Sequence, residues 1–154
     1  MDDEARTFLM ELLEVPSPSG YELDGQRRWR EYVEPYADEL HTDEYGNTVA
    51  VYEGDGPAVA VTGHADEIGY IVRRIDDDGF VHLGRIGGAD RTVSRGQHVQ
   101  IHGPDGPING VIGQTAIHLR EKDDETYDDI AEQHVDIGVE DGEGARELVA
   151  VGDP

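Results

Sequence analysis

The chain has 154 residues, of which 35 are Asp or Glu and 12 are Lys or Arg, so its formal net charge is -23 at pH 7. This length allows one ordinary domain or two small ones. A surface this acidic repels nucleic acid and anionic membranes, which excludes both as expected partners. The absence of cysteine excludes disulfides, thiolate metal sites and a cysteine nucleophile.

The charge and the first residues predict the compartment. The chain begins Met1-Asp2-Asp3-Glu4, unlike a basic signal peptide, and no apolar run approaches the length of a membrane span. We therefore expect a soluble, cytoplasmic protein. Concentrated salt screens repulsion between exposed charges, so the excess of acid, with Lys122 as the single lysine, predicts a halophilic protein. The alternative, an acidic disordered chain, is disfavoured by the apolar periodicity of the segments that follow.

Two helices are predicted first. Asp2 or Asp3 can cap a helix whose apolar stripe has helical spacing and consists of Phe8, Leu9, Leu12 and Leu13. Residues 15–20, which hold two prolines and a glycine, must end it. A second helix is predicted from about residue 23, with a buried face of Trp29, Val33 and Tyr36 and with Pro35 near its end.

Short β-rich runs follow the helices. Residues 39–43, 48–52 and 58–62 are predicted strands, separated by turn residues around 45–47 and 54–57. Helices followed by such a sheet indicate an α/β arrangement. The last of these runs would deliver the segment that begins at His64.

After Gly69 the pattern changes to short strands with Gly, Asp and Pro turns. The predicted strands are residues 70–75, 80–86, 98–102, 108–112 and 135–139. This spacing is typical of a small antiparallel barrel or sandwich, so we place a domain boundary at about residue 68. The acidic residues 121–129 predict an exposed, mobile loop, and a short helix is expected near residues 144–148.

The stretch from Val59 to Gly69 is the candidate site. An apolar run ends at a glycine and is followed by His64 and, two residues later, by Asp66. Side chains two apart on an extended segment point to the same side. A neutral imidazole suits zinc or cobalt, and a neighbouring carboxylate is its usual support. The other interpretation is a pair of polar groups where a strand becomes a loop.

A series of collinear motifs gives the chain a resemblance to a known family. They are Pro18-Ser19-Gly20-Tyr21-Glu22, Asp43-x-x-Gly46-Asn47, Gly63-His64-Ala65-Asp66-Glu67-Ile68-Gly69, Arg85-Ile86-Gly87-Gly88, Gly96-Gln97-His98-Val99, Gly110-Val111-Ile112-Gly113, Ile117-His118-Leu119, Val135-Asp136-Ile137-Gly138 and Val151-Gly152-Asp153-Pro154. In this order they resemble the N-terminal part of the tetrahedral (TET) aminopeptidases, dinuclear-metal glutamyl and leucyl aminopeptidases of which some are labelled endoglucanase.

The resemblance implies a fold and partners. Residues 1–68 would be the N-terminal part of the catalytic α/β domain, the start of a zinc-aminopeptidase-like α/β sandwich. Residues 69–154 would be most of an inserted β-rich, barrel-like subdomain used in dimerisation. It also implies peptide substrates and a homo-oligomer built through that subdomain.

The resemblance also implies roles for residues. His64 matches the first metal ligand, and Asp66 matches the catalytic carboxylate that supports the site. Glu67 lies in the motif without a ligand role, and His118 is as compatible with a structural role as with a functional one. The complete site would hold two divalent ions, zinc or cobalt. The bridging aspartate, the catalytic glutamate with its adjoining ligand and the last two ligands find no counterpart in residues 1–154, so we expect this chain to be inactive alone.

Two alternatives stay open at this point. The β-rich region could persist as a non-catalytic dimerisation or assembly module in which His64 is a relic. A carbohydrate hydrolase is disfavoured, because most glycosidases need two placed carboxylates and no pair among the 35 acidic residues can be singled out.

Overall fold

A computed structural model describes residues 1–119 and 129–154. The chain divides into two compact units, Met1–Glu67 and Ile68–Pro154, which are described separately below. Eight of the nine residues from 121 to 129, predicted as a mobile loop, lie outside the described residues. Within the described ranges, no helix is long and apolar enough to cross a membrane.

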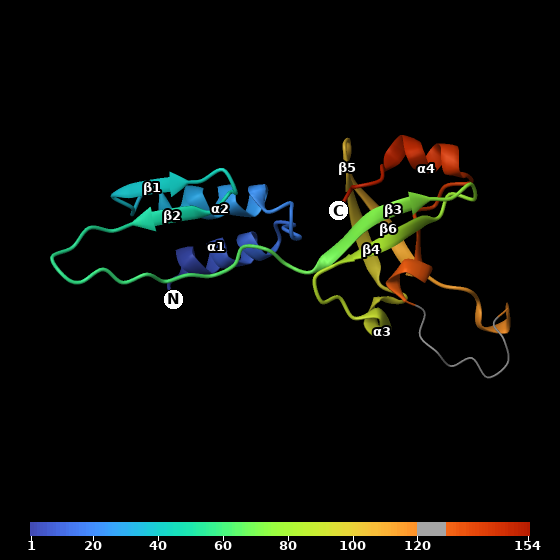
Figure 1. The fold of residues 1–154 in the computed structure, drawn as a ribbon, viewed down its shortest axis with the longest axis horizontal. Coiled ribbons are helices and arrows are strands. Elements are labelled where there is room, and N and C mark those ends of the chain that lie inside the picture. The colour runs from blue at the N-terminus through green and yellow to red at the C-terminus, as the bar shows by residue number, and fades with distance from the viewer. Residues whose placement is uncertain (120–128) are drawn as a thin grey trace. The chain divides into compact units, whose positions relative to one another are not determined.

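The first unit contains two helices and a hairpin (Figure 1). The helix α1 (Asp3–Leu13) begins where Asp2 accepts a hydrogen bond from the Ala5 N–H at 2.8 Å, which confirms the predicted cap. The helix α2 (Leu23–Val33) packs beside it, and the Phe8 and Tyr32 rings stack with centroids 3.8 Å apart. The strands β1 (Glu39–Thr42) and β2 (Thr48–Val51) pair antiparallel.

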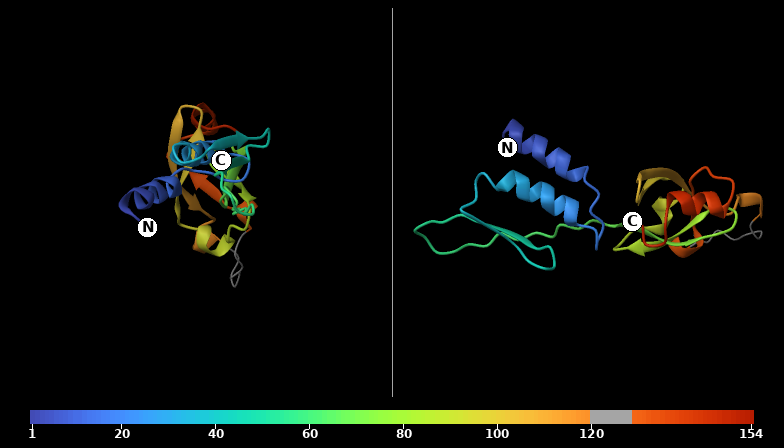
Figure 2. Two further views of the ribbon diagram at one scale, coloured as in Figure 1. Left: turned by 90° about the vertical axis from the view of Figure 1, so that its left-hand side faces the viewer. Right: turned by 90° about the horizontal axis from the view of Figure 1, so that it is seen from above.

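Two predictions for this unit are wrong. Residues 58–62 form no strand, and they run with residues 63–67 as one extended segment (Figures 1 and 2). Val59 and Val61 are 84% and 96% exposed. A strand needs a neighbour for its backbone N–H and C=O groups, and no described strand pairs with this segment. Tyr36 lies beyond the end of α2 and is exposed, because Pro35 follows the helix C-cap.

The second unit is built on an antiparallel sheet of five strands in the order β3-β4-β7-β6-β5. The strands are β3 (Gly69–Ile75), β4 (Val81–Ile86), β5 (His98–Gly103), β6 (Gly106–Gly113) and β7 (His134–Asp136). The sheet curls, as the prediction of a barrel-like arrangement expects. Its edges β3 and β5 both bond to the last residues, since Val72 N–H donates to Asp153 O and His102 N–H donates to Pro154 O, each at 2.9 Å.

The described apolar core lies in this second unit. Alternate residues of the strands point inward and are almost fully buried, and the cluster includes Val72, Val81, Leu83, Ile101, Ile112 and Val135. The helix α4 (Gly142–Leu148), which lies close to the predicted helix, adds Ala145 to this core.

Three short helices were not predicted: α3 (Arg91–Ser94), η1 (Ile117–Leu119) and η2 (Ile130–Glu132). Strand β7 is shorter than predicted, because Ile137 and Val139 pack on the core without pairing.

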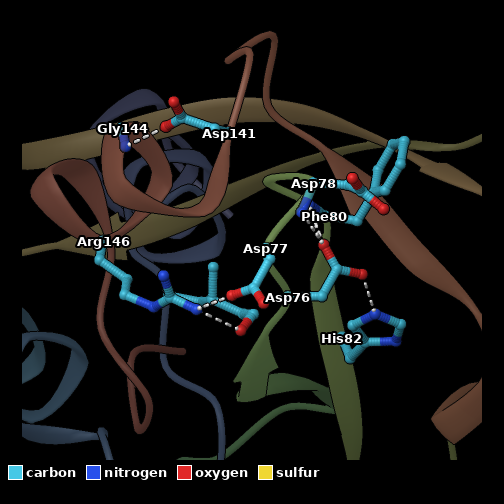
Figure 3. A network of polar contacts seen from close by, with 9 residues as sticks. Asp76, Asp77, Asp78, Phe80, His82, Asp141, Gly144 and Arg146 are labelled. Atoms are coloured by element: carbon cyan, nitrogen blue, oxygen red, sulfur yellow. Dashed lines mark hydrogen bonds and ion pairs between the residues drawn. The ribbon is translucent and has the colours of Figure 1, made fainter.

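A polar network surrounds the turn between β3 and β4 (Figure 3). Asp76 accepts hydrogen bonds from the Phe80 N–H at 2.9 Å and from His82 Nε2 at 2.8 Å. Although partial burial opposes ionisation, the hydrogen bonds from His82 and Phe80 hold the pKa of Asp76 below its usual value. The ring of His134 lies against Phe80, with centroids 4.5 Å apart. Burial, and then the nearby His82, lower the pKa of His134.

The half-buried His134 makes the stability of this unit depend on pH. Its pKa is lower in the folded protein than in the unfolded chain, where it is about 6.5. The unfolded chain therefore takes up the proton first, and the free energy of unfolding should fall as pH decreases from about 7 towards 5. Urea titrations followed by circular dichroism should show a smaller fall for His134→Gln than for the wild type. Replacement of the exposed His41 by Gln is the control, and equal slopes for His134→Gln and wild type would contradict the prediction.

Candidate metal-ligand site

The loop between α1 and α2 holds the segment that contains His64. The Glu67 N–H donates to Ser17 O, and the Ser17 N–H donates back to the Glu67 carboxylate, each at 2.9 Å. Ser17 and Pro18 are buried. Gly25 of α2 lets Ser17 pack closely against that helix, since a Cβ at position 25 would lie 2.3 Å from Ser17 Oγ. The extended segment is thus tied to the helices at its C-terminal end.

His64 and Asp66 form a hydrogen-bonded pair on this segment. His64 Nδ1 lies 2.8 Å from Asp66 Oδ1 and 2.9 Å from the Asp66 carbonyl oxygen. A carbonyl oxygen and an ionised carboxylate can only accept, so Nδ1 carries a hydrogen, and in the neutral imidazole Nε2 then keeps its lone pair. The His64 side chain is 83% exposed. The neutral ring in this tautomer offers Nε2 as the nitrogen that can bind a metal ion.

The Asp66 carboxylate has a second partner. Its Oδ2 accepts a hydrogen bond from the Ser19 hydroxyl, which comes from the α1–α2 loop. The hydrogen bonds from Ser19 and from His64 hold the pKa of Asp66 below its usual value. Asp66 is thus an anionic acceptor that is held from two sides.

The described residues do not bring a full set of possible metal ligands together. Within residues 1–119 and 129–154, no group of three or more His, Asp or Glu side chains is placed to hold an ion. The Glu67 carboxylate accepts a hydrogen bond from the Ser17 N–H. His118 lies exposed in η1 of the second unit. The structure therefore brings His64 and Asp66 together and offers one imidazole nitrogen for an ion.

Sequence reasoning missed Ser19 as a member of this site. It stands 47 residues before Asp66, and local spacing gives no sign that the two side chains meet. Its presence in the Pro18-Ser19-Gly20 motif was the only available signal.

Comparisons with known proteins define the class. The lysyl aminopeptidase of Pyrococcus furiosus is 34% identical over 144 residues, which are 92% of this chain and 42% of that protein. A TET aminopeptidase structure from a marine sediment archaeon of the Thaumarchaeota superimposes with a TM-score of 0.93 at 32% identity, covering 99% of this chain and 44% of that one. A TET peptidase of Pyrococcus horikoshii, described as assembling into a tetrahedron or a large octahedral shell, gives a TM-score of 0.80 at 30% identity over 96% of this chain and 44% of that one.

The fold is thus the mixed α/β fold of aminopeptidases. Residues 46–154 match the M42 glutamyl aminopeptidases, and the chain belongs to this family. The resemblance inferred from the motifs is confirmed. The chain spans less than half the length of these relatives.

Proposed function

We propose that this chain is a portion of a metal-dependent aminopeptidase that removes N-terminal residues from peptides. His64 is the metal ligand and Asp66 the carboxylate that supports it. The hydrogen bond from His64 Nδ1 to Asp66 carries this proposal, because it leaves Nε2 exposed with a free lone pair. Membership of the M42 family supplies the reaction class.

The residues present fit a divalent ion such as zinc or cobalt at one position. When bound, such ions activate a water molecule and polarise the scissile carbonyl group. The part played by this chain is positional. Asp66 selects the tautomer of His64 and fixes its ring, and hydrogen-bonding partners of this kind typically account for 10- to 100-fold in metal affinity or activity.

The remaining ligands are proposed to come from outside residues 1–154. Catalytic zinc typically has three protein ligands, a complete site of this family would hold two ions, and the described residues offer no group of three. Residues 1–68 would form part of the catalytic domain, and residues 69–154 part of the inserted β-rich subdomain. The exposed Val59 and Val61 support a neighbour outside residues 1–154, since they lie on an extended apolar segment that no described strand pairs with. The chain alone should therefore be inactive.

A chimaera tests the proposal. The corresponding residues of the thaumarchaeal TET aminopeptidase, which aligns over 99% of this chain, are replaced by residues 1–154. Hydrolysis of leucyl and glutamyl chromogenic amides is measured in multimolar potassium chloride, with chelator and after addition of zinc or cobalt. We expect metal-dependent hydrolysis by the chimaera and none by the 154-residue chain.

His64→Ala should reduce hydrolysis by the chimaera by more than about 100-fold, since loss of a ligand should exceed the effect of losing its support. The control is His41→Ala, which removes an exposed histidine of the same unit that bonds to Glu39. A folded chimaera that keeps its activity without His64 would contradict the ligand role. Metal-dependent turnover by the unmodified 154-residue chain would contradict the need for outside ligands.

An assembly role is the second candidate, because the second unit has its own buried core. Similar structures are described as a dodecamer and as tetrahedral or octahedral shells, so a homo-oligomer through this unit is proposed as well. Salt-dependent dimers of a chain that lacks metal affinity would favour assembly over catalysis. A halophilic, cytoplasmic protein without nucleic-acid or membrane partners stays the expectation from the net charge of -23.

A further inference from the structure

We propose that Ser19 is a positioning residue, which orients Asp66 and thereby keeps His64 in the tautomer with hydrogen on Nδ1. The inference rests on the proposed function only in naming His64 a metal ligand. The contacts that carry it lie entirely within the first unit.

Asp66 is held at both of its oxygen atoms. Oδ1 accepts from His64 Nδ1, and Oδ2 accepts from the Ser19 hydroxyl. The terminal torsion of an aspartate is broad and roughly two-fold, so a single hydrogen bond leaves the plane of the carboxylate free to turn. A second donor on the other oxygen fixes that plane, and the direction of Oδ1 towards His64 is fixed with it.

Ser19 can do this because its own backbone is anchored. The Tyr21 N–H donates to Pro18 O at 2.8 Å, and the Gly20 N–H donates to the Glu22 carboxylate at 2.7 Å. Gly20 has a φ of 97°, which is a conformation that glycine adopts readily. The two hydrogen bonds between Ser17 and Glu67 hold the neighbouring residues of both segments. The hydroxyl therefore approaches Asp66 from a turn whose position is set independently of the His64 pair.

The hydrogen bond from Ser19 also crosses between two segments that the sequence separates widely. Asp66 and His64 are neighbours on a segment without secondary structure, whereas Ser19 follows α1. A hydroxyl there couples the histidine to the helical part of the unit. If Ser19 served the loop alone, its loss would change stability but leave the imidazole tautomer unaltered.

The experiment measures that tautomer directly. The 154-residue chain is labelled with nitrogen-15 at histidine and studied by NMR in multimolar potassium chloride with chelator, at about pH 8.5, where an ordinary imidazole is neutral. The ratio of the Nδ1–H to the Nε2–H form of His64 is compared among wild type, Ser19→Ala and Ser19→Thr. Thr7→Ala is the matched control, because it removes a hydroxyl that bonds to Asp3 O at 2.8 Å in the same unit.

We expect the Nδ1–H form to predominate in the wild type and the ratio to fall by about twofold or more in Ser19→Ala, the order of effect of one exposed hydrogen bond. Ser19→Thr should restore the ratio, and Thr7→Ala should not change it. A wild-type ratio in Ser19→Ala would overturn the proposal, as would a Ser19→Thr ratio equal to that of Ser19→Ala. Unfolding of the first unit by Ser19→Ala would make Ser19 a structural residue and would also overturn it. No metal or substrate enters this measurement, so its failure is distinct from failure of the chimaera.

Discussion

Ile112→Ala is expected to lower the free energy of unfolding of the second unit by about 2–5 kcal/mol, the usual range for removing a large aliphatic side chain from a core. Ile112 is 1% exposed and lies in β6, where its backbone pairs with that of the fully buried Val135. Its own N–H donates to Gln97 O at 3.0 Å, and its carbonyl accepts from the Gly96 N–H at 2.8 Å. These backbone bonds survive the substitution, so the side chain leaves a cavity that the sheet cannot close.

Val111→Ala is the matched control, because Val111 is adjacent in the same strand and 38% exposed on the opposite face. This variant should lower the free energy of unfolding by no more than about 1 kcal/mol, which is the span of strand propensities in a host protein. Urea unfolding followed by circular dichroism in multimolar potassium chloride compares both variants with the wild type. Equal costs at the two positions would show that the core is not where the structure places it.

The core of the second unit could be predicted because its strands find their partners within the described chain. In β4, Val81 and Leu83 are buried, while His82 and Gly84, which alternate with them, are less so. This alternation has a period of two, which the sequence displays directly. The turns are equally local: Gly79 has a φ of 87° and follows three aspartates, of which Asp76 accepts the Phe80 N–H. Each feature depends on residues that are close in sequence.

The first unit shows where local patterns fail. Residues 58–62 have the composition of a buried strand, yet Val59 and Val61 are almost fully exposed. Composition indicates what a segment can form, but pairing requires a second segment with free backbone groups. The only sheet described in this unit contains β1 and β2. The apolar stripe of α1 is likewise only partly covered, with Leu13 68% exposed.

The candidate site also has one contact that local sequence spacing predicts and others that it does not. His64 and Asp66 are two residues apart, and their contact follows from an extended backbone. Ser19 and Ser17 reach residues 66 and 67 across 47 and 50 positions, which no periodicity encodes. The short helix α3 was missed for a different reason. Asp90 closely follows a Gly-Gly turn and caps a single turn of helix by accepting a hydrogen bond from the Thr92 N–H. The glycines predict a loop, and a single helical turn is too short to show helical periodicity.

Gly142→Ala is the second large effect that we expect, with a loss of about 1–3 kcal/mol in the free energy of unfolding of the second unit, typical of overpacking. Gly142 is buried at the first position of α4, and its N–H donates to Asp77 O at 2.9 Å. A Cβ there would lie 2.2 Å from the carbonyl oxygen of Asp76. That oxygen belongs to the backbone of Asp76, whose side chain also bonds to His82 (Figure 3). It therefore cannot move without disturbing the hydrogen bonds of Asp76.

Gly144→Ala provides the matched control in the same helix. A Cβ at Gly144 would make an ordinary contact, 3.5 Å from Asp141 Oδ1, and the hydrogen bond from the Gly144 N–H to that oxygen would remain. Because alanine favours a helix over glycine by about 0.8–1.0 kcal/mol, this variant should gain up to that amount in the free energy of unfolding. The two substitutions add the same methyl group to one helix, and urea unfolding should move their midpoints in opposite directions. A gain in Gly142→Ala as well would mean that α4 does not pack against the Asp76 turn.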